Sequence, residues 1–428
     1  MPNLTKKSIL GITLLVVLLS WLAWFIPREH FLLLIGVYGL SFCVYFWLIF
    51  QDLPDKVILW TGILLRVIIL FSIPQLSDDV YRFIWDGRLL VAWENPFALR
   101  PSEWMAMSSP PLGINQELHQ LIYADNYTVY PPIHQAVFWV SARFSTSIWG
   151  SIIILKSVLV LGEVALLSFL RKTKEMSPFF VLYALNPLVV LEIAGNGHFE
   201  GLMVLFLTLG LYGLRKNNWR LGGIGFGLAI ATKLLPLMLL PLIWKYVGRK
   251  SNGRMTFFLW VGGVNIALWM PLVLMGSLHH LLESIWLYFE YFEFNASVFY
   301  ALKWLVPNVW RIGIITNMLT VGLIAFMTFR QKAFDFQRLL GSMAIVWGVY
   351  LLNSAIVHPW YVLPFFVLSV MANRWIGVAW TGVIYLSYSH YWGGGMQENY
   401  GLIGLEYVLL ISAFILLRKR KMISYPRV

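Results

Sequence analysis

The chain has 428 residues, of which 59% are hydrophobic and 12% are charged. A soluble domain carries about 25% charged residues, so the composition excludes an ordinary soluble protein and indicates a chain solvated mostly by lipid. The single cysteine, Cys43, excludes an internal disulfide and a cysteine-based metal site, while the net charge of +12 acquires meaning only once the charges are placed along the chain.

The predicted elements are transmembrane helices, because a bilayer core needs roughly 20 apolar residues per helix. The first apolar run follows Lys6 and Lys7, and we interpret it as a span rather than a signal peptide because no small-x-small cleavage site follows. In chain order, the expected spans are Ser8–Ile26, Phe31–Phe50, Lys56–Ile73, Trp149–Leu170, Pro178–Ala194, Phe199–Leu214, Thr256–Met275, Arg311–Phe329, Gln337–Val357, Trp360–Ala372, Trp375–Ser389 and Gly401–Leu417.

Two further segments need a different interpretation. Trp219–Tyr246 is too long for one helix and has basic residues on both flanks, so we expect a short helical pair that turns near Lys233–Pro236. Pro131–Thr146 is expected to lie as a helix at the outer face, because a crossing there would place Arg171–Lys174 outside.

The expected fold is all-α, a polytopic transmembrane bundle with about 14 crossings and both termini inside. We expect residues 1–428 to form a single membrane domain, with a first long outer loop at 75–148 that carries amphipathic helices and a second at 277–310. Basic residues gather in the inner loops and acidic residues in the outer ones, as the positive-inside rule requires of a multi-pass protein of the cell (inner) membrane. The basic charge therefore reflects orientation, and no nucleic-acid partner is expected.

Unusual polar clusters gather on the outer side of this topology, where convergent polar groups at membrane depth indicate a site. A one-sided set favours surface chemistry over transport. The clusters are Ser77–Arg82, Trp85–Arg88, Glu94–Phe97, Tyr130–Gln135, Gly195–Glu200, Phe292–Asn295, His358–Tyr361 and Gly393–Tyr400.

Asp78 and Asp79 begin the first outer loop. Ser77 is placed to cap a helix there, and Asp79 and Arg82 would share one face of it. The pair is explained either as an acidic N-terminus stabilised by the helix dipole or as a source of a carboxylate general base.

Other polar residues also allow two readings. The segment from Trp85 to Arg88 is either a turn with a local ion pair or a sugar-recognition element. His198, near Glu200, is better suited to hydrogen bonding with a phosphate or sugar than to metal ligation. Lys233 either extends its charge to the outer headgroups or neutralises a lipid phosphate. Within the spans, we expect Arg66 and Glu163 to pair.

These motifs resemble the GT-C superfamily of polytopic glycosyltransferases, most closely the bacterial mannosyltransferase-like members related to the mannosyltransferases of GPI-anchor assembly. The resemblance covers roughly Ser77–Pro241, and beyond it only hydropathy and His358-Pro359-Trp360 match. The resembling motifs are Asp79-x-Tyr81-Arg82 through Trp85-Asp86-Gly87-Arg88, Asn95-Pro96-Phe97, Tyr130-Pro131-Pro132, Asn186-Pro187, Asn196-Gly197-His198 and Ala231-Thr232-Lys233-x-x-Pro236. The chain departs from many relatives in having two helices, rather than one, before the span that leads to the first loop.

The resemblance implies an inverting glycosyltransferase that moves a sugar, mannose by family expectation, from a polyprenyl-phosphate donor to a glycan or lipid acceptor at the extracytoplasmic face. An acidic residue of the first outer loop would be the base. This is Asp79 or Asp78, with Asp79 favoured because Tyr81 and Arg82 follow it at the family spacing. No cofactor is implied, no metal ligand set is identified, and a metal requirement is left open. The expected substrate-binding residues are Tyr81, Arg82, Trp85, Asp86, Arg88, Asn95, Tyr130, Pro132, Gln135, Asn196, His198, Glu200, Lys233 and His358.

Two alternative functions follow from other patterns. An outer-face polysaccharide polymerase or ligase would also use outer loops, with its main catalytic loop later in the chain and richer in Arg and His. A secondary transporter predicts internal repeats and polar groups near the midplane, and the sequence has no repeat period that we can detect.

Overall fold

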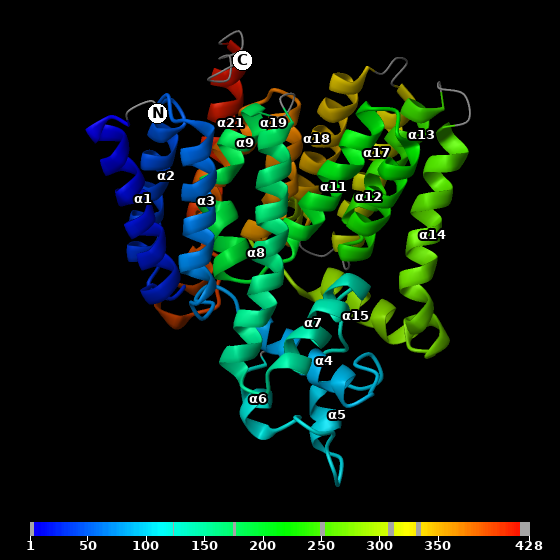
Figure 1. Ribbon diagram of the computed structural model, residues 1–428. Coiled ribbons are helices and arrows are strands. Elements are labelled where there is room, and N and C mark those ends of the chain that lie inside the picture. The colour runs from blue at the N-terminus through cyan, green and yellow to red at the C-terminus, as the bar shows by residue number, and fades with distance from the viewer. Residues whose placement is uncertain are drawn as a thin grey trace. The chain divides into compact units, whose positions relative to one another are not determined.

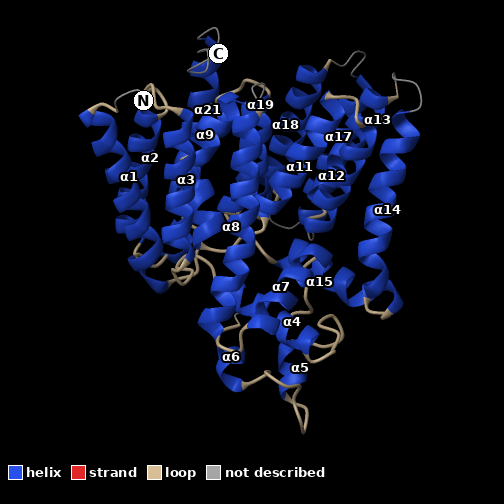
Figure 2. Ribbon diagram, in the orientation of Figure 1, coloured by secondary structure: helices blue, strands red, loops and turns tan. Residues whose placement is uncertain are grey.

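The computed structural model describes residues 4–122, 124–173, 177–248, 253–306, 312–330 and 335–419. Figure 2 shows these residues as helices joined by loops, and their one β-type pairing is an isolated parallel bridge between Phe294 and Ile356. The all-α fold expected from the hydropathy pattern is therefore confirmed.

The chain forms two compact units whose segments alternate along the sequence. Unit 1 comprises residues 1–75, 163–200 and 292–428, and unit 2 comprises residues 76–162 and 201–291. The single membrane domain expected from the sequence stays a prediction.

The helices of unit 1 begin at the N-terminus and resume in the C-terminal half of the chain (Figure 1). They are α1 Lys6–Phe25, α2 Phe31–Leu48, α3 Asp55–Leu70, α9 Ser177–Ala184, α10 Pro187–Val189, the π-helix Val190–Gly195, α16 Val298–Leu305, α17 Ile312–Arg330, α18 Phe336–Asn353, the 3-10 helix Pro359–Tyr361, α19 Val362–Met371, α20 Ile376–Val383, the 3-10 helix Ile384–Gly394 and α21 Tyr400–Lys419.

The helices of unit 2 include those of the first outer loop, as residues 75–148 are called from the expected topology. They are α4 Asp79–Val91, α5 Pro101–Met105, α6 Gln116–Gln120, α7 Pro132–Phe144, α12 Trp219–Thr232, the 3-10 helix Leu235–Leu239, α13 Leu240–Val247, α14 Gly253–Leu274 and α15 Leu278–Tyr291. Two helices cross the unit boundary, namely α8 Ile148–Lys172 and α11 Glu200–Arg215.

Fewer helices than expected are long enough to cross a membrane. Among the described residues, six qualify by length and composition, α1, α2, α8, α14, α17 and α21, and a broken pair of Pro187–Gly195 with α11 would make seven. The expected number of about 14 crossings is therefore not reached by full-length helices. The expected span Pro178–Ala194, for example, is interrupted at Asn186-Pro187, where proline cannot donate to the preceding turn.

The helical structure expected for two unusual segments is confirmed, whereas the sides of the membrane assigned to them stay predictions. The segment Trp219–Tyr246 is a helical pair, because α12 ends at Thr232 and Lys233 is extended before the 3-10 helix that holds Pro236. The segment Pro131–Thr146 is helical as α7.

The helices α4 and α7 pack closely against each other in unit 2. A Cβ atom on Gly87 of α4 would lie 2.3 Å from the carbonyl oxygen of Phe138 in α7, so only glycine permits this approach. The stacked rings of Phe83 and Phe138 lie in the same interface, with centroids 4.7 Å apart. The first outer loop is therefore built on a tightly packed helical pair.

The start of α15 and the Ser277 before it are held against the first outer loop by polar contacts. The amide of Asn95 donates to Ser277 Oγ at 2.7 Å, His280 Nδ1 lies 2.9 Å from the Phe97 carbonyl oxygen, and Arg100 lies 3.3 Å from Glu283. Figure 1 shows α14 leading directly into α15. Polar contacts between residues 95–100 and 277–283 therefore join the two outer loops that were expected from the sequence.

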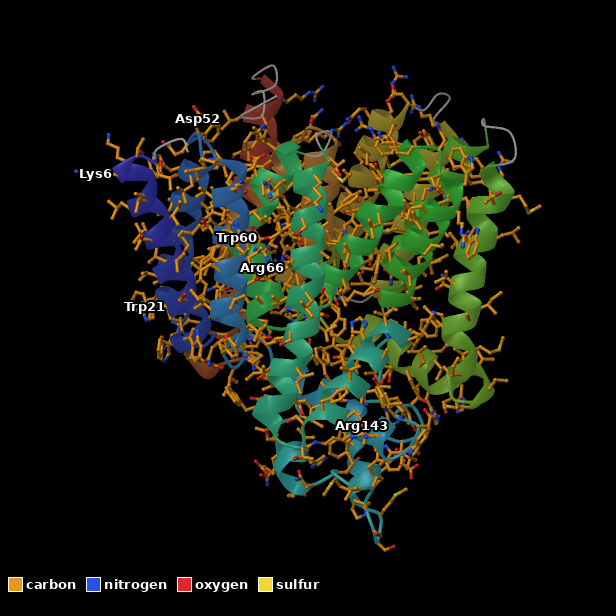
Figure 3. The ribbon with its side chains drawn as sticks, viewed as in Figure 1. Lys6, Trp21, Asp52, Trp60, Arg66 and Arg143 are labelled. Atoms are coloured by element: carbon orange, nitrogen blue, oxygen red, sulfur yellow. The ribbon has the colours of Figure 1, made fainter. Side chains whose placement is uncertain are left out.

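A buried ion pair links three helices of unit 1. Arg66 of α3, labelled in Figure 3, donates from Nη2 to Glu163 Oε2 at 2.8 Å, and both side chains are fully buried. Arg66 also donates to the Ala184 carbonyl oxygen that ends α9, while the Tyr183 hydroxyl donates to the second carboxylate oxygen of Glu163. The pairing expected from the sequence is confirmed.

Removing one partner of this ion pair should destabilise the protein strongly. The variant Glu163→Gln leaves the Arg66 charge buried without its counter-charge, a defect that costs about 3–5 kcal/mol. We expect a clearly lowered thermal unfolding midpoint in detergent, and a smaller loss in the double variant Arg66→Met/Glu163→Met. The matched control is Arg338→Gln, which breaks an exposed pair with Asp335 and should change the midpoint little. Equal effects of Glu163→Gln and Arg338→Gln would contradict this assignment.

Candidate functional site

The N-terminus of α4 carries the two candidate base residues. Asp78 precedes the helix and Asp79 is its first residue, and both side chains are half-buried. The backbone N–H of Asp79 donates to Ser77 Oγ at 3.3 Å, but the N-cap position of α4 is Asp78 rather than the predicted Ser77, and no side chain caps the helix. Burial raises the pKa of the Tyr81 hydroxyl, and the negative charge of Asp78 raises it further. Asp78 and Tyr81 are therefore neighbours at a partly solvated helix end.

Asp86, about two turns further along α4, is completely buried and accepts three side-chain hydrogen bonds. Arg82 Nε donates to one carboxylate oxygen at 2.9 Å, while Gln135 at 3.0 Å and the Thr128 hydroxyl donate to the other. The segment Trp85–Arg88 is helical rather than a turn, and the ion pair of Asp86 is with Arg82, outside that segment. The i,i+4 spacing inside a helix explains that choice of partner.

Trp85 and Arg88 are also held in the interior of unit 2. Trp85 is fully buried beside the ring of His119. Arg88 donates to the carbonyl oxygens of Gly113 and Thr146, each at 2.8 Å, so it ties α4 to the loops on either side. Burial lowers the pKa of Arg88, and the charge of Glu117 partly opposes that change. Both side chains therefore stabilise the folded first outer loop. Their expected role in sugar binding stays a prediction.

The motif that closes the first outer loop joins the same network. Pro132 is the first residue of α7, and Gln135 reaches both Asp86 and the Tyr130 carbonyl oxygen. The Tyr130 ring meets Phe83 edge-on at 4.8 Å. Elsewhere in unit 2, Asn95 caps a turn through Phe97 N–H, and half-buried Lys233 occupies the break after α12.

Unit 1 gathers a second set of candidates around a carboxylate that the sequence analysis missed. Glu192 lies in the π-helix Val190–Gly195 and is completely buried. Asn196 donates to its Oε2 at 3.1 Å, and His198 Nδ1 lies 3.0 Å from the same oxygen. Glu200, the first residue of α11, is 1% exposed. The one available signal for Glu192 was an acidic residue within an otherwise apolar run.

Aromatic rings connect His198 to three other segments of unit 1. The His198 ring stacks on Trp360 with centroids 3.6 Å apart, and His358 stacks on the same indole at 4.4 Å. Phe294 lies 4.5 Å from His358 and 5.1 Å from His390. We call these five rings the imidazole–aromatic cluster. Rings from four segments that are separate in the sequence therefore lie together. The segments are Gly195–Glu200, Phe292–Asn295, His358–Tyr361 and the one that begins at His390.

The candidates thus form one set in each unit. In unit 1, His198 and His358 belong to the imidazole–aromatic cluster and Asn196 is a hydrogen-bond partner of Glu192. The candidates in the expected first outer loop of unit 2 are Tyr81, Arg82, Trp85, Asp86, Arg88, Asn95, Tyr130, Pro132 and Gln135. Over the described ranges, His, Cys, Asp and Glu side chains form no group of three or more placed to hold a metal ion.

Comparison with known proteins identifies one matching family. No curated protein matches the chain. The domain described as the alpha-(1->6)-mannopyranosyltransferase N-terminal domain matches residues 10–249, which is more than half of the chain and includes Asp78, Asp79, Glu192, His198 and Lys233. The chain therefore belongs to the alpha-(1->6)-mannopyranosyltransferase family and is a polytopic membrane mannosyltransferase.

Proposed function

We propose that this protein transfers a mannosyl residue from a polyprenyl-phosphate donor to a hydroxyl group of a glycan or lipid acceptor, with inversion at the anomeric carbon, at the extracytoplasmic face of the cell (inner) membrane. The match to the mannosyltransferase domain supports the sugar and the reaction class. The donor, the inversion and the side of the membrane rest on the residues discussed below.

The observation that carries the proposal is the contrast between the acidic residues of α4. Asp86 is fully buried and its carboxylate is occupied by three donors, so it cannot approach a substrate hydroxyl. Asp78 and Asp79 lie at the start of the same helix and remain partly solvated. A general base must come within hydrogen-bond reach of the proton that it removes. We therefore assign the base to this pair, and to Asp79 in particular.

The chemistry needs few groups because the donor phosphate leaves readily. Asp79 takes the proton of the acceptor hydroxyl, the oxygen attacks the anomeric carbon, and the bond to the phosphate oxygen breaks on the opposite face of the sugar. An α-linked product then requires a β-linked mannosyl phosphate donor. The departing phosphate needs cations or hydrogen-bond donors, and we assign this role to Lys233, which belongs to the same unit as Asp79. Arg82 is less suited, because it already binds Asp86 and the Asn126 carbonyl oxygen.

The alternatives from the sequence lose support in different ways. A polymerase or ligase would place its main catalytic loop late in the chain, whereas the matched family domain lies in the N-terminal part. A transporter would gain support from matching broken helices in two halves of the chain. The described breaks at Asn186-Pro187 and at Lys233 differ in kind, since one leads into a π-helix and the other into a 3-10 helix.

The variant Asp79→Asn should lose transfer activity without losing the fold. Removing a general base lowers kcat by about 10²–10⁴-fold, and the donor KM should change little because the amide keeps the size of the side chain. Initial rates with a polyprenyl-phosphate mannose donor measure both constants. Glu94→Gln, at an exposed acid beyond the end of α4, is the control and should keep wild-type rates. A larger loss in Asp78→Asn than in Asp79→Asn would move the base to Asp78, and near-normal activity of both variants would refute the base assignment.

Cysteine labelling tests the proposed orientation. Asn196 is a poor position because it is 2% exposed, whereas Leu112 in the first outer loop is 88% exposed. In a Cys43→Ser background, Leu112→Cys should react with a membrane-impermeant maleimide in intact spheroplasts. Lys216→Cys, exposed beyond α11, should react only after permeabilisation. The opposite pattern would place the candidate base on the cytoplasmic side.

A further inference from the structure

One face of α14 is apolar and exposed along the whole helix. Met255, Ile266, Val273 and Leu274 are all exposed, and at about 100° per residue they fall within about 100° of one another around the axis. A helix rises about 1.5 Å per residue, so the face from Met255 to Leu274 is about 28 Å long, close to the roughly 30 Å thickness of a bilayer core. This face therefore has the length and composition of a surface that contacts lipid.

The exposed apolar surface continues where α14 ends. Met275, directly after the helix, is exposed. Gly276 then has a φ of +71°, a left-handed conformation that favours glycine. Figure 1 shows α15 turning away from the axis of α14 rather than extending it. The chain thus changes direction at the level where the apolar core of a bilayer would end.

One side of α15 is anchored to the rest of unit 2. Leu281 is buried in a cluster with Phe97 and Leu272. His280 Nδ1 lies 2.9 Å from the Phe97 carbonyl oxygen, and the His280 ring stacks on Tyr127 with centroids 4.0 Å apart. These contacts fix the rotation of the helix about its axis, so the side chains on its other side have a defined direction.

The exposed side of α15 is divided between apolar and polar residues. Leu278, Leu282 and Trp286 are exposed at positions i, i+4 and i+8, so they form a stripe about 80° wide. We call these three residues the apolar stripe. His279 and Glu283 are exposed directly beside it. An apolar stripe next to charged side chains is typical of a helix that lies in the membrane–water interface, a level at which tryptophan is enriched.

Continuity with α14 identifies lipid as the partner of the apolar stripe. The stripe begins four residues after Leu274, and exposed Met275 lies between them, so one exposed apolar surface passes from α14 to α15. In a polytopic membrane protein, the exposed face of a span-length apolar helix contacts acyl chains. The surface that adjoins the end of this face therefore lies where acyl chains meet headgroups.

We propose that α15 lies along the surface of the bilayer, with the apolar stripe inserted among the acyl chains next to the headgroups and with His279 and Glu283 on the side of the headgroups. Because Ser277 and His280 contact Asn95 and Phe97, α15 would also connect the bilayer surface to the expected first outer loop. This contact with lipid does not depend on the donor of the proposed function.

Spin labels in proteoliposomes test this placement. In a Cys43→Ser background, Leu282→Cys carries a nitroxide in the apolar stripe, and its collisions with oxygen, which concentrates in lipid, are compared with those of a water-soluble nickel chelate. We expect this label to favour oxygen and to lie about 5–10 Å deep in the boundary between headgroups and acyl chains. The matched control His279→Cys, on the polar side of the same helix, should favour the chelate.

Two reference positions calibrate the measurement. Ile266→Cys, in the middle of α14, should report the bilayer core, and Leu112→Cys, in the expected first outer loop, should report water. A Leu282→Cys label that favours the chelate as Leu112→Cys does would place the apolar stripe in water. Shielding of the label from both reagents would show that protein covers the stripe, and a depth equal to that of Ile266→Cys would make α15 part of a span. Each of these three results overturns the proposal.

A second labelling position covers the case in which Leu282→Cys does not fold normally. The thermal unfolding midpoint of each labelled variant in detergent should match that of the Cys43→Ser protein. If Leu282→Cys lowers this midpoint, Leu278→Cys carries the label instead, because it is exposed on the same stripe. Preference for oxygen is again the expected result, and preference for the chelate at Leu278→Cys would overturn the proposal in the same way.

Discussion

Glu192 is the buried charge around which unit 1 is organised. Because a carboxylate inside a low-dielectric bundle must be hydrogen-bonded, donors come both from the turn that follows it and from a segment almost 200 residues away. The π-helix supplies the carboxylate, the turn at Gly197 supplies His198, and the 3-10 helix Ile384–Gly394 supplies two tyrosine hydroxyls. The same constraint acts on Arg66 and Glu163, which join α3, α8 and α9. Buried charge therefore determines which of the short helices of unit 1 pack together.

A buried carboxylate that must be hydrogen-bonded also organises the expected first outer loop of unit 2. Asp86 is buried between α4 and α7, and its three donors come from α4 itself, from the segment before α7 and from α7. The network fixes the position of α4, and with it the partly solvated Asp78 and Asp79 at the helix N-terminus. The buried carboxylate of Asp86 thus fixes the helix whose N-terminus carries the partly exposed carboxylates of Asp78 and Asp79. The contacts of residues 95–100 with 277–283 extend this rigid frame to α15.

Local signals predicted much of this architecture. Hydropathy identified the long helices, Ser77 marked the start of α4, the proline after Lys233 marked the break after α12, and two charges inside spans predicted the contact between Arg66 and Glu163. Each of these features depends on residues close in sequence or on the cost of burying a charge. The clustering of His198, His358 and Phe294 was not predictable, because stacking of distant rings depends on tertiary packing.

The errors have physical causes as well. Two of the expected spans are not continuous α-helices, because Asn186-Pro187 and the 3-10 segment after Val383 interrupt them. Trp85–Arg88 was read as a possible turn with a local ion pair, whereas the segment is helical and Asp86 pairs with Arg82 at the i,i+4 spacing. Glu192 was overlooked because its partners Tyr385 and Tyr388 lie in a segment that resembles a simple span.

The most direct test of the account is the donor and product of the purified wild-type protein in lipid vesicles. Polyprenyl-phosphate β-mannose and a nucleotide α-mannose would be supplied separately with a mannoside acceptor, and the product linkage would be determined by NMR. The account predicts that only the polyprenyl-phosphate donor is consumed and that the new linkage is α, the result of inversion. Consumption of the nucleotide sugar, or a β-linked product from the lipid donor, would contradict it.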